Sequence, residues 1–174
     1  SSERVAEATT LVIMNKKEYA GTCYMYFPSS GNYGNGTSIA YVPLGNREGM
    51  FEELIHHEMG GHGFAKLGDE YYDSSTSYEE FYNTKIEPWE PNLTTLVNFE
   101  SKWKEMLPAG TAIPTAPLSD KKDNTDVGVY EGGGYMAKGI YRPVMDCRMK
   151  TNQAQGFCPV CQRAIEKMIE YYCK

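Results

Sequence analysis

Short runs of apolar, β-branched and aromatic residues recur through the first quarter of this chain. Each run is followed by a stretch rich in Gly, Ser, Asn or Lys, which is typical of a loop. Runs of four to eight such residues bounded by loop residues are typical of strands. The pattern therefore predicts three strands, at 10–14, 23–27 and 38–42.

Two later segments change to helical spacing. Phe51, Leu54, Ile55 and Met59 recur every three or four residues and predict a helix over about 48–64. An amphipathic stripe ending at Tyr172 predicts a C-terminal helix over 159–172. Between them the pattern weakens, and we expect a short helix near 77–84, another at 99–107, and a loop over 108–134 that includes three successive glycines.

Composition narrows the class of protein. At 174 residues the chain is long enough for one domain with a real core, and 41% hydrophobic and 23% charged residues are ordinary for a globular protein. The net charge of −6, without a basic run, argues against nucleic-acid binding. No apolar stretch approaches the ~18 residues of a membrane span. Fourteen tyrosines suit an extracellular protein with an aromatic surface.

All three histidines lie in the predicted helix 48–64, within one stretch of seven residues. His57-Glu58-Met59-Gly60-Gly61-His62 has one residue more than the zinc-peptidase signature H-E-x-x-H. On an α-helix each residue turns about 100°, so positions five apart diverge by about 140°. A π-bulge returns such positions to one face. Gly60 and Gly61 lie where the helix would widen. Each glycine lowers the stability of a helix by roughly 1 kcal/mol relative to alanine, and metal binding can offset that cost.

The residue types then suggest roles in a zinc site. His57 and His62 are the expected ligands, and Glu58 is the expected general base that takes a proton from water and passes it to the leaving amine. His56 is assigned a supporting structural role. Asp69 is the preferred third ligand, because Gly68 lets the chain turn back as it does in metzincins. The alternatives for that position are Glu70 and, more distantly, Glu79 and Glu80.

These motifs resemble the IgA-peptidase family of bacterial zinc metallopeptidases. The specific part of the resemblance runs from His57 to Tyr71. Weaker matches lie on both sides of it, in the order in which they occur in the family, at 21–26, 39–43, 131–133, 141–149 and 157–161. The spacing H-E-x-x-G-H is similar to that of dipeptidyl peptidase III. The resemblance implies an α/β (α+β) zincin-like catalytic domain with a mixed sheet, an active-site helix and a C-terminal helical part. It also implies a secreted or cell-surface bacterial endopeptidase that binds Zn²⁺ and acts on protein or peptide, with immunoglobulin or another host glycoprotein as a possible substrate.

Further roles follow only from the resemblance. Strand 38–42 would be the sheet edge that binds extended substrate, and Met149 would lie beneath the metal. Gly132 to Gly134 would let the substrate backbone approach. The candidates for stabilising the oxyanion are Tyr71, Tyr135 and Tyr141, among which the sequence does not choose. The catalytic domain of the family usually begins well upstream of a segment like 11–15, so the resemblance implies that this chain is the C-terminal portion of a longer protein.

Five cysteines leave an odd number for pairing: Cys23, Cys147, Cys158, Cys161 and Cys173. The spacing Cys158-x-x-Cys161 suits a redox pair or half of a zinc knuckle, but a second C-x-x-C is absent from the sequence. We therefore prefer a local disulfide involving Cys147, or buried thiols.

Two other functions remain open. The first is a non-catalytic protein- or glycan-binding module on a zincin scaffold, in which the added glycine has abolished zinc binding; an intact Glu58 argues against it. The second is a zinc exopeptidase, in which a blocked cleft near 131–135 captures a chain terminus. The oligomeric state is not encoded in these patterns.

Overall fold

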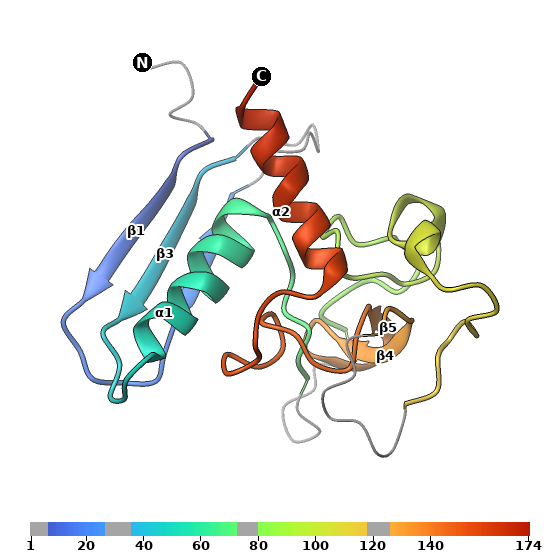
Figure 1. Ribbon diagram of the computed structural model, residues 1–174, viewed down its shortest axis with the longest axis horizontal. Coiled ribbons are helices and arrows are strands. Elements are labelled where there is room, and N and C mark those ends of the chain that lie inside the picture. The colour runs from blue at the N-terminus through green and yellow to red at the C-terminus, as the bar shows by residue number, and fades with distance from the viewer. Residues whose placement is uncertain (1–6, 27–35, 73–79, 118–125) are drawn as a thin grey trace. The chain divides into compact units, whose positions relative to one another are not determined.

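The computed structural model describes residues 7–26, 36–72, 80–117 and 126–174 (Figure 1). The chain divides into two compact units. The first comprises residues 1–66 with 164–174, and the second comprises 67–163. Each unit is described separately below.

A three-stranded mixed sheet forms the first unit. It consists of β1 (Thr9–Met14), β2 (Thr22–Met25) and β3 (Ser38–Pro43), and these confirm the three predicted strands. The strand order is β1-β3-β2, with β3 parallel to β1 and antiparallel to β2. The expectation that strand 38–42 is a sheet edge is therefore wrong. Both sides of β3 are hydrogen-bonded within the sheet, which leaves it no free side on which to add a substrate strand.

The helix that follows β3 is confirmed, and it changes type along its length. It begins as α1 (Met50–Leu54) and continues without a break as the π-helix η2 (Ile55–Phe64). Met50 and Leu54 are buried against Val42 of β3 and anchor the helix to the sheet. Figure 1 shows α1 beside β3. The same apolar spacing that predicts the helix thus also fixes its position on the sheet.

The predicted C-terminal helix is also confirmed, as α2 (Pro159–Tyr172). It starts in the second unit and ends in the first. Within the first unit the rings of Phe64 and Tyr172 stack at 5.9 Å between centroids. The end of η2 is therefore packed on the last turn of α2.

A β-hairpin forms part of the second unit. It pairs β4 (Tyr130–Gly133) with β5 (Met136–Arg142), so the end of the predicted 108–134 loop is a strand. Gly132 and Gly134 have positive φ, and a Cβ on either would overlap the ring of Tyr72 or Tyr82. The glycine run therefore admits the protein's own tyrosine rings, and the expected approach of substrate backbone there is not supported.

The predicted helix at 99–107 is wrong. Two separate 3₁₀ turns occupy the segment, η3 (Phe99–Ser101) and η4 (Lys104–Met106). Lys102 interrupts the helical backbone, since its φ of −103° and ψ of −122° lie outside the helical region. Its buried ammonium donates to the carbonyls of Pro88 and Glu90 instead. Part of the short helix expected at 77–84 lies outside the described residues, and 80–84 form turns.

Candidate metal centre

The π-helix η2 resolves the five-residue spacing of the two histidines. The amide of Ala65 donates to the carbonyl of Gly60 at 3.0 Å, the five-residue hydrogen bond of a π-helix. The expected widening is confirmed, and it extends over ten residues instead of one turn. His57, Glu58 and His62 are all carried by this widened segment.

The side chains of His57 and His62 converge. Their Nε2 atoms lie 3.2 Å apart, with ring centroids at 4.9 Å and ring planes at 77°. Two imidazole nitrogens bound to one tetrahedral zinc at ~2.05 Å are ~3.3 Å apart. The pair therefore has the separation that a shared zinc ion requires.

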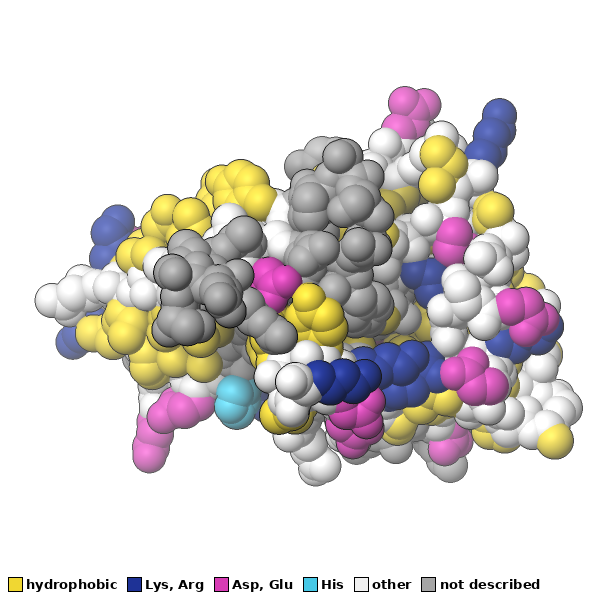
Figure 2. Space-filling view, turned by 90° about the horizontal axis from the view of Figure 1, so that it is seen from above, with side chains coloured by type: hydrophobic (Ala, Val, Ile, Leu, Met, Phe, Trp, Pro, Cys, Tyr) yellow, Lys and Arg dark blue, Asp and Glu magenta, His cyan; other side chains and the backbone are white. Residues whose placement is uncertain are grey.

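Burial separates these histidines from the third. His57 is 5% exposed and His62 is 6% exposed, whereas His56 lies in the exposed class. Little histidine surface is visible on the face in Figure 2, where acidic and basic side chains are interspersed. The supporting structural role expected for His56 stays a prediction.

Glu58 is held close to the backbone of Gly21, which precedes β2. Glu58 is 6% exposed, and a Cβ on Gly21 would lie 2.5 Å from its Oε1. Only glycine leaves space for the carboxylate in this position. The sequence analysis placed Gly21 in a weak family segment and missed this role, since residues 21 and 58 meet only after the sheet has formed.

Lys66 fixes the C-terminal end of η2. Its Nζ donates to the Gly63 carbonyl at 2.7 Å and to Ser38 Oγ at 2.6 Å. The hydroxyl of Thr9 donates to the same carbonyl at 3.1 Å. A cation is favourable at a helix C-terminus, where carbonyls lack helical partners. Burial nevertheless lowers the pKa of Lys66. Apart from its place after the motif, no pattern in the chain pointed to Lys66.

Asp69 lies in the second unit and is 7% exposed. The hydroxyl of Tyr135 donates to Asp69 Oδ2. Burial, together with the Asp69 charge, raises the pKa of Tyr135. The hydroxyl therefore keeps the proton that it donates to Asp69. Of the three tyrosines considered for the oxyanion, Tyr135 thus binds a carboxylate. The hydroxyl oxygens of Tyr71 and Tyr135 lie 3.5 Å apart.

Glu70 belongs to a different set of contacts from Asp69. It is completely buried, and it accepts from Asn92 Nδ2 at 2.9 Å and from the Cys161 thiol at 3.3 Å. Burial raises its pKa well above the usual carboxyl value. The backbone amide of Glu70 donates to the carbonyl of Met149, a fully buried residue of the same unit. Of the more distant alternatives, Glu80 is exposed and Glu79 lies outside the described residues.

Comparison with protein families decides the class of protein. The family described as IgA Peptidase M64 matches residues 2–122 and 115–169, nearly the whole chain. The chain belongs to the IgA peptidase M64 family. The resemblance found in the sequence is therefore confirmed, and the mixed α+β fold agrees with it.

Membership makes this M64 chain a peptidase, a hydrolase of peptide bonds. M64 peptidases are metallopeptidases, and the buried histidine pair supplies candidate metal ligands. No curated protein matches the chain. Among the described residues there is no helix both long and apolar enough to cross a membrane.

Proposed function

We propose that this M64 chain is a zinc-dependent metalloendopeptidase. His57, His62 and Asp69 bind the ion and Glu58 is the general base. The observation that carries the proposal is the 3.2 Å separation of two buried imidazole nitrogens on a π-helix. A non-catalytic module that had lost its metal would have no reason to keep this separation, or to retain a buried carboxylate beside it.

The donor set fits zinc. Two imidazoles and a carboxylate with one open position make a common catalytic zinc site. When bound, the ion supplies Lewis acidity, which lowers the pKa of water to about 7 and polarises the scissile carbonyl. Soft thiolate donors would instead favour a closed structural site.

The chain's own residues perform the proton transfers. Glu58 takes a proton from the attacking water and delivers it to the leaving amine. Its burial and its contact with Gly21 hold the carboxylate in one position, which is what a positioned base requires. No other residue on η2 is an acid, so this role falls to Glu58 alone among the described residues of that helix.

Three features support Asp69 as the third ligand. The Tyr135 hydroxyl donates to one of its oxygens, an arrangement that orients metal-binding carboxylates. Its neighbour Glu70 instead accepts through one oxygen from Asn92 and Cys161, away from Tyr135. Asp69 is also the first carboxylate that follows His62 along the described chain, three residues after Lys66, whose φ is 57°.

We infer an extracellular bacterial protein as the setting, with host glycoprotein or immunoglobulin as a substrate class. This inference rests on the description of the family alone. Incubation with immunoglobulin A and with an unrelated glycoprotein tests it. Cleavage of the first but not the second supports an immunoglobulin substrate, and equal cleavage of both contradicts that specificity.

The test of the proposed function combines metal content with peptide cleavage. The purified chain is expected to contain zinc, to cleave an internally quenched peptide with both ends blocked, and to lose activity with a chelator. His62→Ala is expected to lose the zinc and the activity. Glu58→Gln is expected to keep the zinc and lose at least 10²-fold in kcat. Cleavage only of peptides with free termini would favour an exopeptidase. Wild-type kcat in Glu58→Gln would overturn the assignment of the base.

A further inference from the structure

Four metal-ligating side chains meet in the second unit, apart from the histidine pair. They are Glu70, Cys147, Cys158 and Cys161, and all four are buried. One ligand atom from each lies within 4.8 Å of the ligand atoms of the other three. The cluster joins residues up to 91 positions apart, so no local motif explains it.

The sulfur separation is that of two ligands on one ion. Cys147 Sγ and Cys161 Sγ lie 3.8 Å apart. Two thiolates at ~2.3 Å from a tetrahedral zinc are ~3.8 Å apart, whereas a disulfide requires ~2.05 Å. These cysteines, together with Cys158, carry free thiols in the structure.

Neighbouring groups already orient the ligands. The backbone amide of Cys158 donates to Cys147 Sγ at 3.1 Å. Asn92 donates to Glu70 Oε1 at 2.9 Å, and the Asn92 amide is itself fixed by two hydrogen bonds with the Gly68 backbone. Donors of this kind set the orientation of ligands around a bound metal.

One carboxylate oxygen in the cluster is left without a partner. Glu70 is completely buried, and its Oε2 makes no hydrogen bond within the part of the chain that the structure describes. A buried acceptor without a partner costs about 1–3 kcal/mol. An ion between this oxygen and the three sulfurs would satisfy it.

We propose that Glu70, Cys147, Cys158 and Cys161 form a second metal site, a closed tetrahedral zinc site with three thiolates and one carboxylate. Thiolate-rich closed coordination is typical of structural zinc. The site would connect three separate segments of the second unit, at 70, at 147 and at the start of α2. In the sequence only Cys158 and Cys161 stand close together, so the pattern of cysteines alone does not predict this site.

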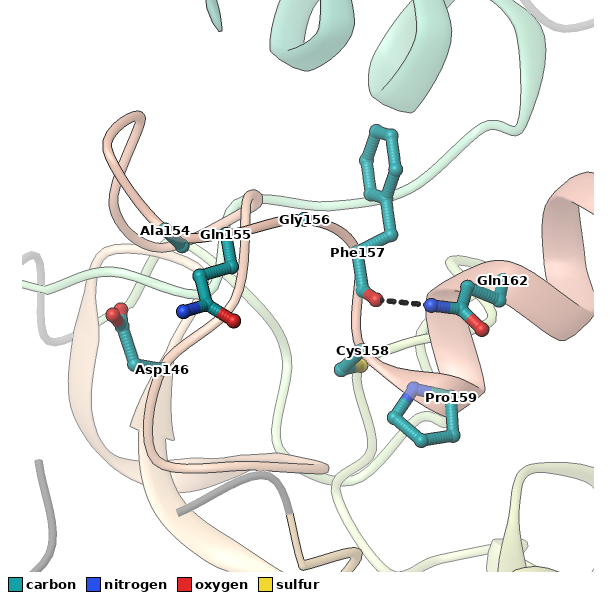
Figure 3. Close-up of a pocket in the computed structure, with 8 residues that line it drawn as sticks. All are labelled: Asp146, Ala154, Gln155, Gly156, Phe157, Cys158, Pro159 and Gln162. Carbon is teal, nitrogen blue, oxygen red and sulfur yellow. Dashed lines mark hydrogen bonds between the residues drawn. The ribbon is translucent and has the colours of Figure 1, made fainter. Parts of the chain in front are cut away.

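The charge of the site fits a divalent cation. Three thiolates and a carboxylate carry more negative charge than zinc neutralises. The positive charges of Arg142 and Lys150 interact with Glu70 and reduce that excess. Cys158 also lines a pocket of about 490 Å³ with Asp146, Gln155 and Pro159 (Figure 3). The pocket therefore borders one member of the cluster, Cys158.

Elemental analysis of the purified chain tests the proposal, with variants of both sites. We expect two zinc ions per chain in the wild type and one in His62→Ala, because the second site does not use the histidines. Cys158→Ser should lose one zinc, whereas the matched control Cys173→Ser should keep both, since Cys173 is an exposed thiol outside the cluster.

Cobalt replacement identifies the ligands without relying on a cysteine variant that fails to fold. Co²⁺-loaded His62→Ala should show thiolate-to-cobalt charge-transfer absorption, and Cys158→Ser should lose it. The proposal is overturned if Co²⁺-loaded His62→Ala lacks that absorption, or if mass spectrometry finds two of the three cysteines in a disulfide. Because His62→Ala removes the catalytic ion, failure of the proposed peptidase site and failure of the second site give different results.

Discussion

Gly21 provides a test of how tightly the general base is positioned. Gly21→Ala introduces a single methyl group. The position has no positive φ, so alanine is tolerated by the backbone. The new Cβ would lie 2.5 Å from Glu58 Oε1, while ordinary contact begins at 3.4 Å. The carboxylate must therefore move by the difference, 3.4 − 2.5 = 0.9 Å.

The cost of that movement should fall on catalysis more than on folding. The new Cβ would also lie 2.9 Å from Glu58 Cγ, so the whole buried side chain must shift, and the stability should fall by about 1 kcal/mol, the low end of the usual cost of overpacking. A catalytic group displaced by about 1 Å can lose ~10²-fold in rate, equivalent to ~2.7 kcal/mol in the barrier. We expect kcat to fall by about that factor, with zinc content unchanged because His57 and His62 are not touched.

The assay is cleavage of the end-blocked quenched peptide, with zinc analysis and thermal unfolding on the same samples. Gly156→Ala is the matched control, because a Cβ there meets nothing within 4 Å and its φ is not positive. In the Glu58→Gln background Gly21→Ala should cost no further activity. Wild-type kcat in Gly21→Ala, with zinc bound and the fold intact, would refute the claim that Gly21 positions the base.

Three more predictions concern the surroundings of the site. Tyr135→Phe removes the donor to Asp69 and should weaken zinc binding 10–100-fold in chelator competition; unchanged affinity would argue against Asp69 as a ligand. Lys66→Met should cost about 1–3 kcal/mol in urea unfolding. Burial lowers the pKa of Lys66 in the folded state, so between the pKa of the folded state and that of the unfolded state the unfolded chain binds more protons. The free energy of unfolding of the wild type should therefore rise with pH in that range, and that of the variant should not. Trp103→Ala should cost about 3–5 kcal/mol, since Trp103 is fully buried and its Nε1 donates to the Gly128 carbonyl; a loss below 1 kcal/mol would contradict this.

Local pattern predicted most of the first unit. The strands, the helix on β3 and even its widening follow from spacing and from Gly60 and Gly61, because each depends on neighbours in sequence. The helix at 99–107 failed for the opposite reason. There the side chain of Lys102 leaves the helical path to bind carbonyls more than ten residues earlier, and a tertiary contact overrides helical propensity.

The same distinction explains which site residues the sequence missed. His57, Glu58 and His62 are neighbours in sequence, and their chemistry is recognisable from spacing alone. Gly21 meets Glu58 from the residue before β2, and Cys147 meets Glu70 only through folding. No periodicity in the chain records either contact. Contacts of this kind become visible only when the topology is known.

The adjacent pair Asp69 and Glu70 links the two metal sites that we propose for this M64 peptidase. Asp69 accepts from Tyr135 and Glu70 meets Asn92 and Cys161, so the two side chains have separate partners. A zinc ion on Glu70 would hold the backbone that carries Asp69, and the two ions would then be connected by one peptide unit. The isosteric variants Asp69→Asn and Glu70→Gln separate the roles.

Asp69→Asn should lose the ion held by the histidines, along with peptide cleavage, and keep the cobalt–thiolate absorption. Glu70→Gln should weaken that absorption and keep cleavage within about tenfold when zinc is in excess, since the effect of a supporting ligand is indirect. If Glu70→Gln abolishes cleavage and zinc binding by the histidines while Asp69→Asn does not, Glu70 is the third catalytic ligand. The three cysteines would then have only three ligands to offer a metal ion, and one tetrahedral position would stay open. The assignment of a closed structural zinc site would then be wrong.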